Sequence, residues 1–188
     1  MDLGLRYTAT SSGGDPAADI PNLGVVFRYR FSDNWLVGGA IDKVEFDFED
    51  PASFLGLVQD PAVPTRDSKI KGQLVSGWVE REIGEPSRKF KWYWSGGAGI
   101  ASTRATDASG PLTSGGTFQI ETETGPEIVA STGLGIRWDL GKHWRIDVTA
   151  RVDHHLIDWT VTDGVSGATT TVDDFTAAGG SFLFSYRF

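Results

Sequence analysis

Histidines next to carboxylates are the first residues in this chain whose types and spacing could do chemistry. Asp153-His154-His155 precede Asp158, and a histidine held by a carboxylate is the base of Ser–His–acid hydrolases. Such catalysis also needs a serine within reach and an oxyanion hole, and no serine motif accompanies the pair. We therefore predict no catalytic residue and interpret the two histidines as an interfacial pair. A lipid-modifying hydrolase and fortuitous metal binding are the alternatives.

The acidic run Glu45, Asp47, Glu49 and Asp50 is the second candidate. Carboxylate oxygens suit Ca²⁺, but the run lacks the Gly-punctuated spacing of a dedicated loop, so we favour a solvated acidic segment. The glycine-rich run 96–99 is not a phosphate loop, because no helix follows and no Lys-Ser/Thr completes it. The chain has no Cys, which excludes thiol catalysis and cysteine zinc sites. We predict no enzyme, no metal and no cofactor.

Charged and apolar residues alternate with a period of two, which indicates β-strands as the elements that position them. In one segment Trp144, Ile146 and Val148 alternate with Arg145 and Asp147. Helical periodicity does not compete with this pattern anywhere, and Gly and β-branched residues are too frequent for long helices. The eight predicted strands lie at 2–10, 22–31, 35–41, 70–83, 90–103, 128–140, 144–153 and 175–188.

The third segment leaves its phase open. Trp35, Val37 and Ile41 share one parity, but beyond position 42 the apolar residues move to the other parity at Val44 and Phe46. A β-bulge, or emergence of the strand from the bilayer, would explain the change.

The fourth segment allows two phases. Either Val75 and Val79 face outward, or Trp78 does. We prefer the first, because it turns Glu80 and Glu82 inward, and two carboxylates that face lipid would be costly.

Connections between these segments alternate in length. The short ones are 32–34, 84–89 and 141–143, and the long ones are 11–21, 42–69, 105–127 and 158–174. Short turns at one rim and long loops at the other are the plan of outer-membrane barrels, periplasmic and extracellular respectively. We predict an all-β fold, an eight-stranded antiparallel up-and-down transmembrane barrel, with residues 1–188 as one domain.

Charge and hydropathy are consistent with this fold. No apolar run reaches the roughly 18–20 residues of a membrane helix, but a spanning strand needs only about 9–11. The four long segments hold 17 of the 25 acids and three of the 17 bases. We expect these acids to serve solubility; the alternatives are that they coordinate divalent cations beside lipopolysaccharide or repel anions at the mouth of the barrel. The pI of about 4.8 with scattered bases argues against nucleic-acid binding.

Aromatic residues gather at the ends of the predicted strands. A girdle at the short-turn rim consists of Phe31, Trp35, Phe90, Trp92, Trp138, Trp144, Tyr186 and Phe188. A thinner group near the long segments consists of Tyr7, Phe46, Phe118, Trp159 and Phe175. Amphipathic rings collect at lipid interfaces, so we expect two girdles that flank an apolar band.

The opposite face of each strand supplies the predicted lumen. It carries Arg6, Arg28, Arg30, Glu80, Glu82, Arg137, Asp139, Arg145, Asp147, Arg151, Asp153 and Arg187. An eight-stranded barrel is only wide enough for its side chains to fill it, and buried charges are tolerable only when paired. We predict an ion-paired, largely plugged lumen, in which Arg187 pairs with Asp2 or Asp147.

Three stretches resemble a known family. Residues 23–35, 89–100 and 185–188 are similar to the strand–turn–strand, fifth-strand and closing-strand patterns of small outer-membrane barrels of the OmpA and OmpW types. The resemblance implies insertion by the outer-membrane assembly machinery, with Phe184, Tyr186 and Phe188 as the assembly signal. It also implies export to the bacterial outer membrane. The start Met1-Asp2 lacks a basic, apolar leader, so we expect the signal peptide to be absent from this sequence.

The chain departs from both types. OmpW-type barrels pass small hydrophobic molecules through an apolar lumen that opens sideways, but the predicted fourth strand has no Pro and the predicted lumen is charged. OmpA-type proteins often carry a peptidoglycan-binding domain after the barrel, and this sequence ends with its last strand. We expect a monomeric, non-enzymatic barrel with a structural or surface receptor and adhesion role. It would contact outer-membrane lipids and lipopolysaccharide. The alternative is a passive channel for small hydrophobic solutes.

Overall fold

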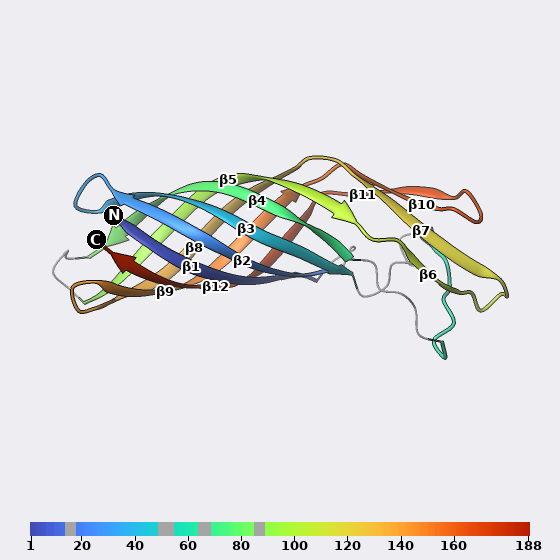
Figure 1. Cartoon of the computed structure of the whole chain (residues 1–188), viewed down its shortest axis with the longest axis horizontal. Helices are drawn as coiled ribbons and strands as arrows, with labels where there is room; N and C mark the ends of the chain where they lie inside the picture. Colours follow the sequence, from blue (N-terminus) through green and yellow to red (C-terminus); the bar gives the residue numbers. More distant parts are fainter. Residues whose placement is uncertain (14–17, 49–54, 64–68, 85–88) are drawn as a thin grey trace.

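In the part of the chain that the structure describes, eight β-strands close into a barrel and four more form a second sheet (Figure 1). This computed structural model describes residues 1–13, 18–48, 55–63, 69–84 and 89–188. The barrel strands are β1 (Asp2–Ser12), β2 (Ala18–Arg30), β3 (Trp35–Phe48), β4 (Lys69–Ile83), β5 (Phe90–Ala105), β8 (Glu127–Leu140), β9 (Trp144–Leu156) and β12 (Phe175–Arg187). Among the described residues, no helix is long and apolar enough to cross a membrane.

The barrel has the predicted antiparallel, up-and-down topology. Its order is β1-β12-β9-β8-β5-β4-β3-β2, so the first and last strands meet. Leu3 lies opposite Tyr186, and Leu5 lies opposite Phe184. This pairing removes both sheet edges, and it brings the two termini to the same end of the barrel (Figure 1).

Side chains alternate strictly between the outer wall and the lumen. Val75 and Val79 are exposed on the outer wall, whereas Glu80 and Glu82 are buried inside. The β3–β4 register runs without a shift from Trp35 opposite Arg81 to the far end of β3. The bulge, one of the two explanations considered for the change of parity, is therefore absent from the β3–β4 ladder. Unbroken alternation simply carries the later apolar residues of β3 into the lumen.

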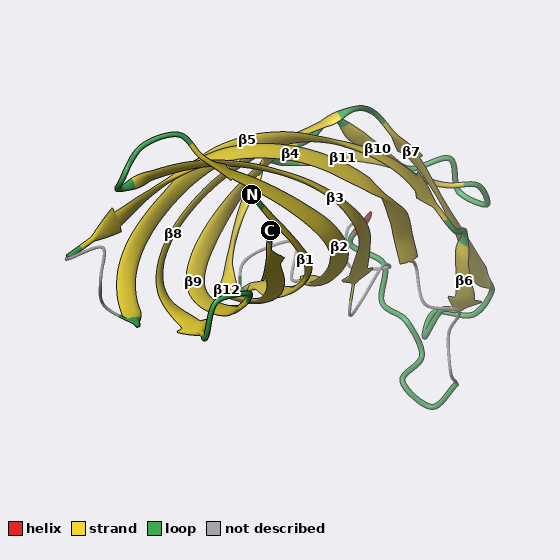
Figure 2. Ribbon diagram, turned by 60° about the vertical axis from the view of Figure 1, so that its left-hand side comes forward, coloured by secondary structure: helices red, strands yellow, loops and turns green. Residues whose placement is uncertain are grey.

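The second sheet is built from two connections that the sequence suggested were loops. It contains β6 (Ala108–Pro111), β7 (Thr117–Thr124), β10 (Trp159–Asp163) and β11 (Thr169–Val172), in the order β11-β10-β7-β6. The four strands project from the end of the barrel opposite the termini (Figures 1 and 2). We call this unit the rim sheet.

A one-residue offset joins the rim sheet to the barrel wall. Thr124 lies opposite Trp159, whereas Ile128 lies opposite Leu156, so the β7–β8 side has one more residue than the β9–β10 side. The extra residue falls at Gly125-Pro126, where a bulge is expected because Pro cannot donate to the ladder. Because of the offset, the inward side chains are even-numbered in β7 but odd-numbered in β8, whereas they are odd-numbered in both β9 and β10.

An apolar core fills the lumen beneath the rim sheet. We call it the roof core; it consists of Ile20, Val44, Phe46, Ile70, Leu74, Ala101, Ala108, Phe118, Ile120, Val129, Trp159, Val161, Val172, Phe175 and Ala177. The Phe46 and Trp159 rings meet edge-on at 5.2 Å. The core thus continues from the barrel into the rim sheet.

The second aromatic girdle was predicted wrongly. Of its five residues only Tyr7 is exposed on the outer wall. The other four, Phe46, Phe118, Trp159 and Phe175, are buried in the roof core. Phe46 and Phe175 lie on the inward faces of their own strands, and Trp159 continues the inward parity of β9. Phe118 is turned inward by the bulge.

The ladder between β2 and β3 is interrupted at one point. Ile20 and Pro21 have no partners in the described strand β3, although the residues on either side of them are paired. Proline carries no N–H group, so it cannot complete the ladder here. Ile20 belongs to the roof core, which therefore lies directly behind the interruption.

Candidate functional site

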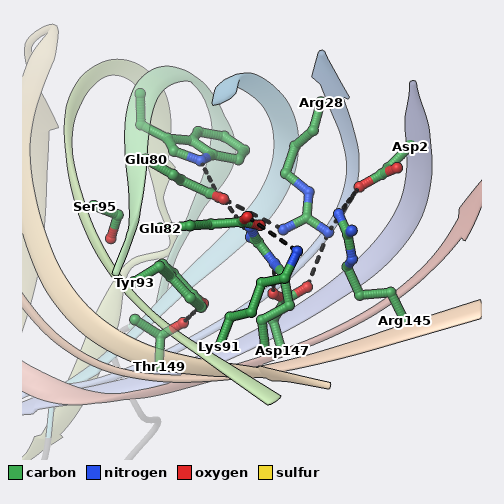
Figure 3. A network of polar contacts seen from close by, with 12 residues as sticks. Asp2, Arg28, Glu80, Glu82, Lys91, Tyr93, Ser95, Arg145, Asp147 and Thr149 are labelled. Atoms are coloured by element: carbon green, nitrogen blue, oxygen red, sulfur yellow. Dashed lines mark hydrogen bonds and ion pairs between the residues drawn. The ribbon is translucent and has the colours of Figure 1, made fainter. Parts of the chain in front are cut away.

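The lumen near the termini is filled by a network of ion pairs, which we call the floor network. Its members are Asp2, Arg28, Arg30, Glu80, Glu82, Lys91, Arg137, Asp139, Arg145, Asp147 and Arg187, and most of them are drawn in Figure 3. They come from β1, β2, β4, β5, β8, β9 and β12. Alternation places every one of these side chains on the inner face.

Arg137 is the central cation of the floor network. Its Nε donates to Asp147 at 2.5 Å, its NH1 donates to Glu82 at 2.7 Å, and its NH2 donates to Glu80. The guanidinium also lies over the Tyr93 ring, 4.5 Å from the centroid. Because the side chain is fully buried, these three acids are what makes its charge tolerable there.

Arg28 links the opposite side of the lumen to the same acids. Its NH2 donates to Asp147 at 2.9 Å and to the Ser185 hydroxyl at 3.0 Å. Its NH1 lies 3.5 Å from Glu80. Asp147 and Glu80 are thus shared by two buried arginines, and the network crosses the barrel from β2 to β8.

A second group of pairs lies nearer the opening at the termini. Arg145 donates to Asp139 at 2.8 Å and also to Asp2. Arg187 donates to Asp139 at 2.6 Å and lies 3.8 Å from Asp2. Of the two partners predicted for Arg187 the structure supplies Asp2, but its nearest acid is Asp139. Asp147 is held by Arg28 and Arg137 instead.

The middle of the lumen is polar and incompletely filled. Arg6 binds Asp42 at 2.5 Å and lies over the Trp78 ring at 4.9 Å. A cavity of about 60 Å³ lies beside them, lined largely by serine, threonine and glycine. Arg151 faces the same cavity and donates to Asp153 at 2.6 Å. This space is about the size of two water molecules.

A single polar pair is enclosed in the roof core. His155 binds Glu127 through Nδ1 and stacks on Phe175, with centroids 4.7 Å apart. His154 points to the outer wall, where it lies 3.0 Å from the Thr176 hydroxyl. Among the described residues, neither histidine hydrogen-bonds to a serine. The described contacts of the two histidines are thus with a threonine hydroxyl and a carboxylate, and not with the serine that a Ser–His–acid site requires.

The structure brings the predicted lumen residues together in two places. Most of them lie in the floor network, whereas Arg6, Arg151 and Asp153 lie in the middle of the lumen. The end of the lumen next to the rim sheet is filled by the apolar roof core, which was not predicted from the sequence. The reason is that late residues of β3 and the connections after β5 and β9 contribute apolar side chains to it.

Several functional residues were missed in the sequence. Lys91 pairs with Glu82 at 3.2 Å, and Asp42 is the partner of Arg6. Glu127 is fully buried beside His155. Parity would have found all of these, since Lys91 alternates with the outward Phe90 and Trp92. In the described barrel strands the inward faces carry eight acids and, without His155, eight bases, so the lumen is electrically balanced.

The predicted girdle residues at the short-turn rim lie on the outer wall. Six of them, Phe31, Phe90, Trp92, Trp138, Trp144 and Phe188, are exposed, and Trp35 and Tyr186 are half-buried. Phe90 stacks on Trp138 with centroids 5.1 Å apart, and Trp144 stacks on Phe184 at 4.8 Å. Both stacked pairs lie at the end of the barrel that carries the termini.

Among the described residues, no group of three or more His, Cys, Asp or Glu side chains is arranged to hold a metal ion. Two members of the acidic run that was considered for Ca²⁺ contact Lys69 instead. Its ammonium group lies 3.1 Å from Asp47 and 3.4 Å from Glu45. Glu49 and Asp50 lie outside the described residues.

Comparison with known proteins reveals the same fold elsewhere. No protein-family model matches the chain, and no curated protein matches its sequence. The outer membrane protein OprG from Pseudomonas aeruginosa is similar in structure, with a TM-score of 0.58 and 15% identity over 97% of this chain and 95% of that chain. The outer membrane enzyme PagL is similar with a TM-score of 0.51 and 14% identity over 98% of each chain. The chain thus has the fold of small eight-stranded outer-membrane β-barrels.

Proposed function

We propose that the protein is an integral barrel of the bacterial outer membrane with a sealed lumen and a non-enzymatic role in structure or surface binding. The exposed apolar outer wall and the aromatic girdle support insertion in a bilayer, because such a surface is unfavourable in water. The likeness in fold to two outer-membrane proteins supports the choice of membrane. The rim sheet would then project beyond the bilayer and be available to partners.

The floor network is the observation that carries this proposal. Arg28 and Arg137 are fully buried and joined to acids from across the lumen. An ion that entered from either side would have to separate these pairs, and a charge left unpaired in a buried site is strongly unfavourable. The network therefore acts as a plug.

The first prediction concerns conductance. Protein refolded in detergent and reconstituted in planar bilayers is expected to show no conductance above that of the bare membrane. In Arg137→Ala three acids lose a shared partner, so intermittent ion conductance is expected. Arg81→Ala is the control, since Arg81 lies on the outer wall over the Trp35 ring. Steady conductance of the unaltered protein would contradict the proposal.

A second candidate function is uptake of small hydrophobic solutes. It is favoured by the apolar roof core and by the interrupted ladder at Pro21, which together place an apolar part of the lumen behind a weak point of the wall. A solute would enter from the rim and leave sideways into the bilayer, never meeting the floor network. This path needs movement of roof-core side chains, because they are close-packed.

The Pro21→Val variant separates the two functions. Val supplies the missing N–H, so the ladder should close, and uptake of an apolar fluorescent probe into proteoliposomes should fall. Ala9→Val is the matched control, because Ala9 lies opposite Pro21 on β1 and leaves the β2–β3 ladder unchanged. Probe uptake equal to that of empty liposomes in all three proteins would remove the uptake function.

The enzymatic alternative has a separate test. The fold itself does not exclude it, since PagL is an outer membrane enzyme. Mass spectrometry compares the lipids of cells that produce the unaltered protein with those of cells that produce the His154→Ala or the His155→Ala variant. The proposal expects the same lipid pattern in all three. Lipid turnover that depends on either histidine would overturn the non-enzymatic role.

A further inference from the structure

A group of cations lies on the outer wall at the end of the barrel that carries the rim sheet. Lys43, Lys71 and Arg104 come from the adjacent strands β3, β4 and β5, and all three are exposed. They line a shallow groove of about 440 Å³ whose other walls include Gln73 and Thr106. We call these three residues and the groove the basic ledge.

The register forces two of these cations together. Lys71 lies directly opposite Arg104 in the β4–β5 ladder. Like charges directly opposite each other on one face of a sheet destabilise it. An anion bound between the Lys71 and Arg104 side chains would be stabilised by both charges.

Neighbouring acids do not neutralise the ledge. Glu45 lies 3.8 Å from Lys71, but it is also 3.4 Å from Lys69, which binds Asp47. In the described part of the chain, Lys43 and Arg104 make no ion pair.

The ledge is continuous with the apolar wall. On the outer face of β3, the exposed Ile41 is the next outward residue before Lys43. On β4 and β5, one outward residue separates the exposed Val75 from Lys71 and the exposed Ile100 from Arg104. Ladder partners Val75 and Ile100 show that this boundary is level across the strands. Long basic side chains at such a boundary extend toward headgroups while their stems stay on apolar surface.

We propose that the basic ledge binds the phosphate of a membrane-lipid headgroup, in the leaflet on the rim-sheet side. The inference rests on the proposed membrane insertion and deepens it by naming a lipid partner. The headgroup phosphate occupies the position between Lys71 and Arg104, with Lys43 beside it. Arg104 provides a planar fork that suits two phosphate oxygens, and Lys71 provides a compact charge. The acyl chains continue along the apolar wall below.

Native mass spectrometry of the refolded protein tests this directly. The protein is released from mixed micelles that contain equal amounts of phosphatidic acid and phosphatidylcholine. The expected result is at least about a tenfold preference for phosphatidic acid. The double variant Lys71→Gln/Arg104→Gln should lose most of that preference. The control Lys89→Gln/Lys142→Gln removes the same charge at the other end of the barrel, where both side chains are exposed, and should keep it.

Other results would overturn the inference. No preference in the unaltered protein, or equal losses in both double variants, would mean that the ledge has no specific lipid site. Displacement of bound lipid by an equal concentration of inorganic phosphate would mean that a free anion is the ligand. A dimer that persists without bound lipid would assign the ledge to a second copy of the chain.

The outcome is separable from that of the proposed function. Heat-modifiable migration on gels and β-type circular dichroism report a folded barrel in each variant. A barrel that folds, inserts and does not conduct, but has no phosphate preference, contradicts only the ledge. A chain that stays soluble without detergent contradicts the membrane insertion itself.

Discussion

At the scale of single residues, the lumen is shaped by close contacts between aromatic rings and glycines. Trp78 lies in the middle of the lumen, donates from Nε1 to Glu80 at 2.7 Å and supports Arg6 on its face. A Cβ on Gly38 would lie 2.4 Å from the indole. The glycine is therefore needed for the tryptophan, and the tryptophan places two charged groups.

This contact predicts a difference between adjacent glycines. Gly38→Ala should lower the free energy of unfolding by about 1–3 kcal/mol, because the added methyl overlaps the Trp78 ring. Gly39→Ala is the control, since its Cβ would meet only the Ser76 carbonyl at 3.6 Å. Urea unfolding of both variants in detergent measures the difference. Equal stability of the two would refute the contact.

At the scale of elements, the rim sheet depends on the turn between β10 and β11. Asp163 accepts hydrogen bonds from the Ser166 hydroxyl at 2.6 Å, the Ser166 amide at 3.0 Å and the Gln119 amide of β7 at 2.9 Å. These hydrogen bonds, that of the Ser166 side chain foremost, lower the pKa of Asp163 to about 2. One carboxylate thus joins the turn to the neighbouring hairpin.

The lowered pKa gives the rim sheet a defined acid sensitivity. Because the folded pKa lies below the unfolded value, the stabilisation is complete above about pH 4 and is lost as the pH falls toward 2. In Asp163→Asn the amide cannot accept all of these hydrogen bonds, so the loss should be present already at pH 7. Amide hydrogen exchange of β7 and β10 as a function of pH measures it. Asp158→Asn should leave the profile unchanged, and a pH-independent profile in the unaltered protein would contradict the assignment.

At the scale of the whole molecule, three layers follow one another along the barrel axis. The floor network is charged, the middle is polar and the roof core is apolar and continuous with the rim sheet. Trp159 is fully buried where the barrel and the rim sheet meet. It joins two units whose backbone ladders are offset from each other by one residue.

This arrangement predicts that the roof can be loosened without opening the barrel. Trp159→Ala should cost about 3–5 kcal/mol of local stability, so amides of β7 and β10 should exchange faster. Those of β1 and β12 should keep their protection, because the barrel ladders are intact. Trp144→Ala on the exposed outer wall is the control. Loss of protection throughout the barrel in Trp159→Ala would show that the two units do not separate.

The barrel could be predicted from the order of the residues alone. Alternation with a period of two identified all eight strands and the inward faces of β4 and β9, because successive side chains on a strand point to opposite faces of the sheet. The same rule, applied past position 42, would have placed Val44 and Phe46 inside. The change of the apolar residues to the other parity left the phase of this strand open in the sequence.

Which inward residues meet, and what the long connections do, could not be predicted without the folded barrel. Ion-pair partners such as Arg137 and Glu80 are 57 positions apart, and their distance depends on barrel closure and stagger. The rim sheet pairs β7 with β10, two short strands from different connections that are stable only together. The ladder offset at Gly125-Pro126 and the meeting of Lys71 with Arg104 are likewise matters of register. Register is the alignment of residues on two paired strands, so it cannot be read from the sequence of either strand alone.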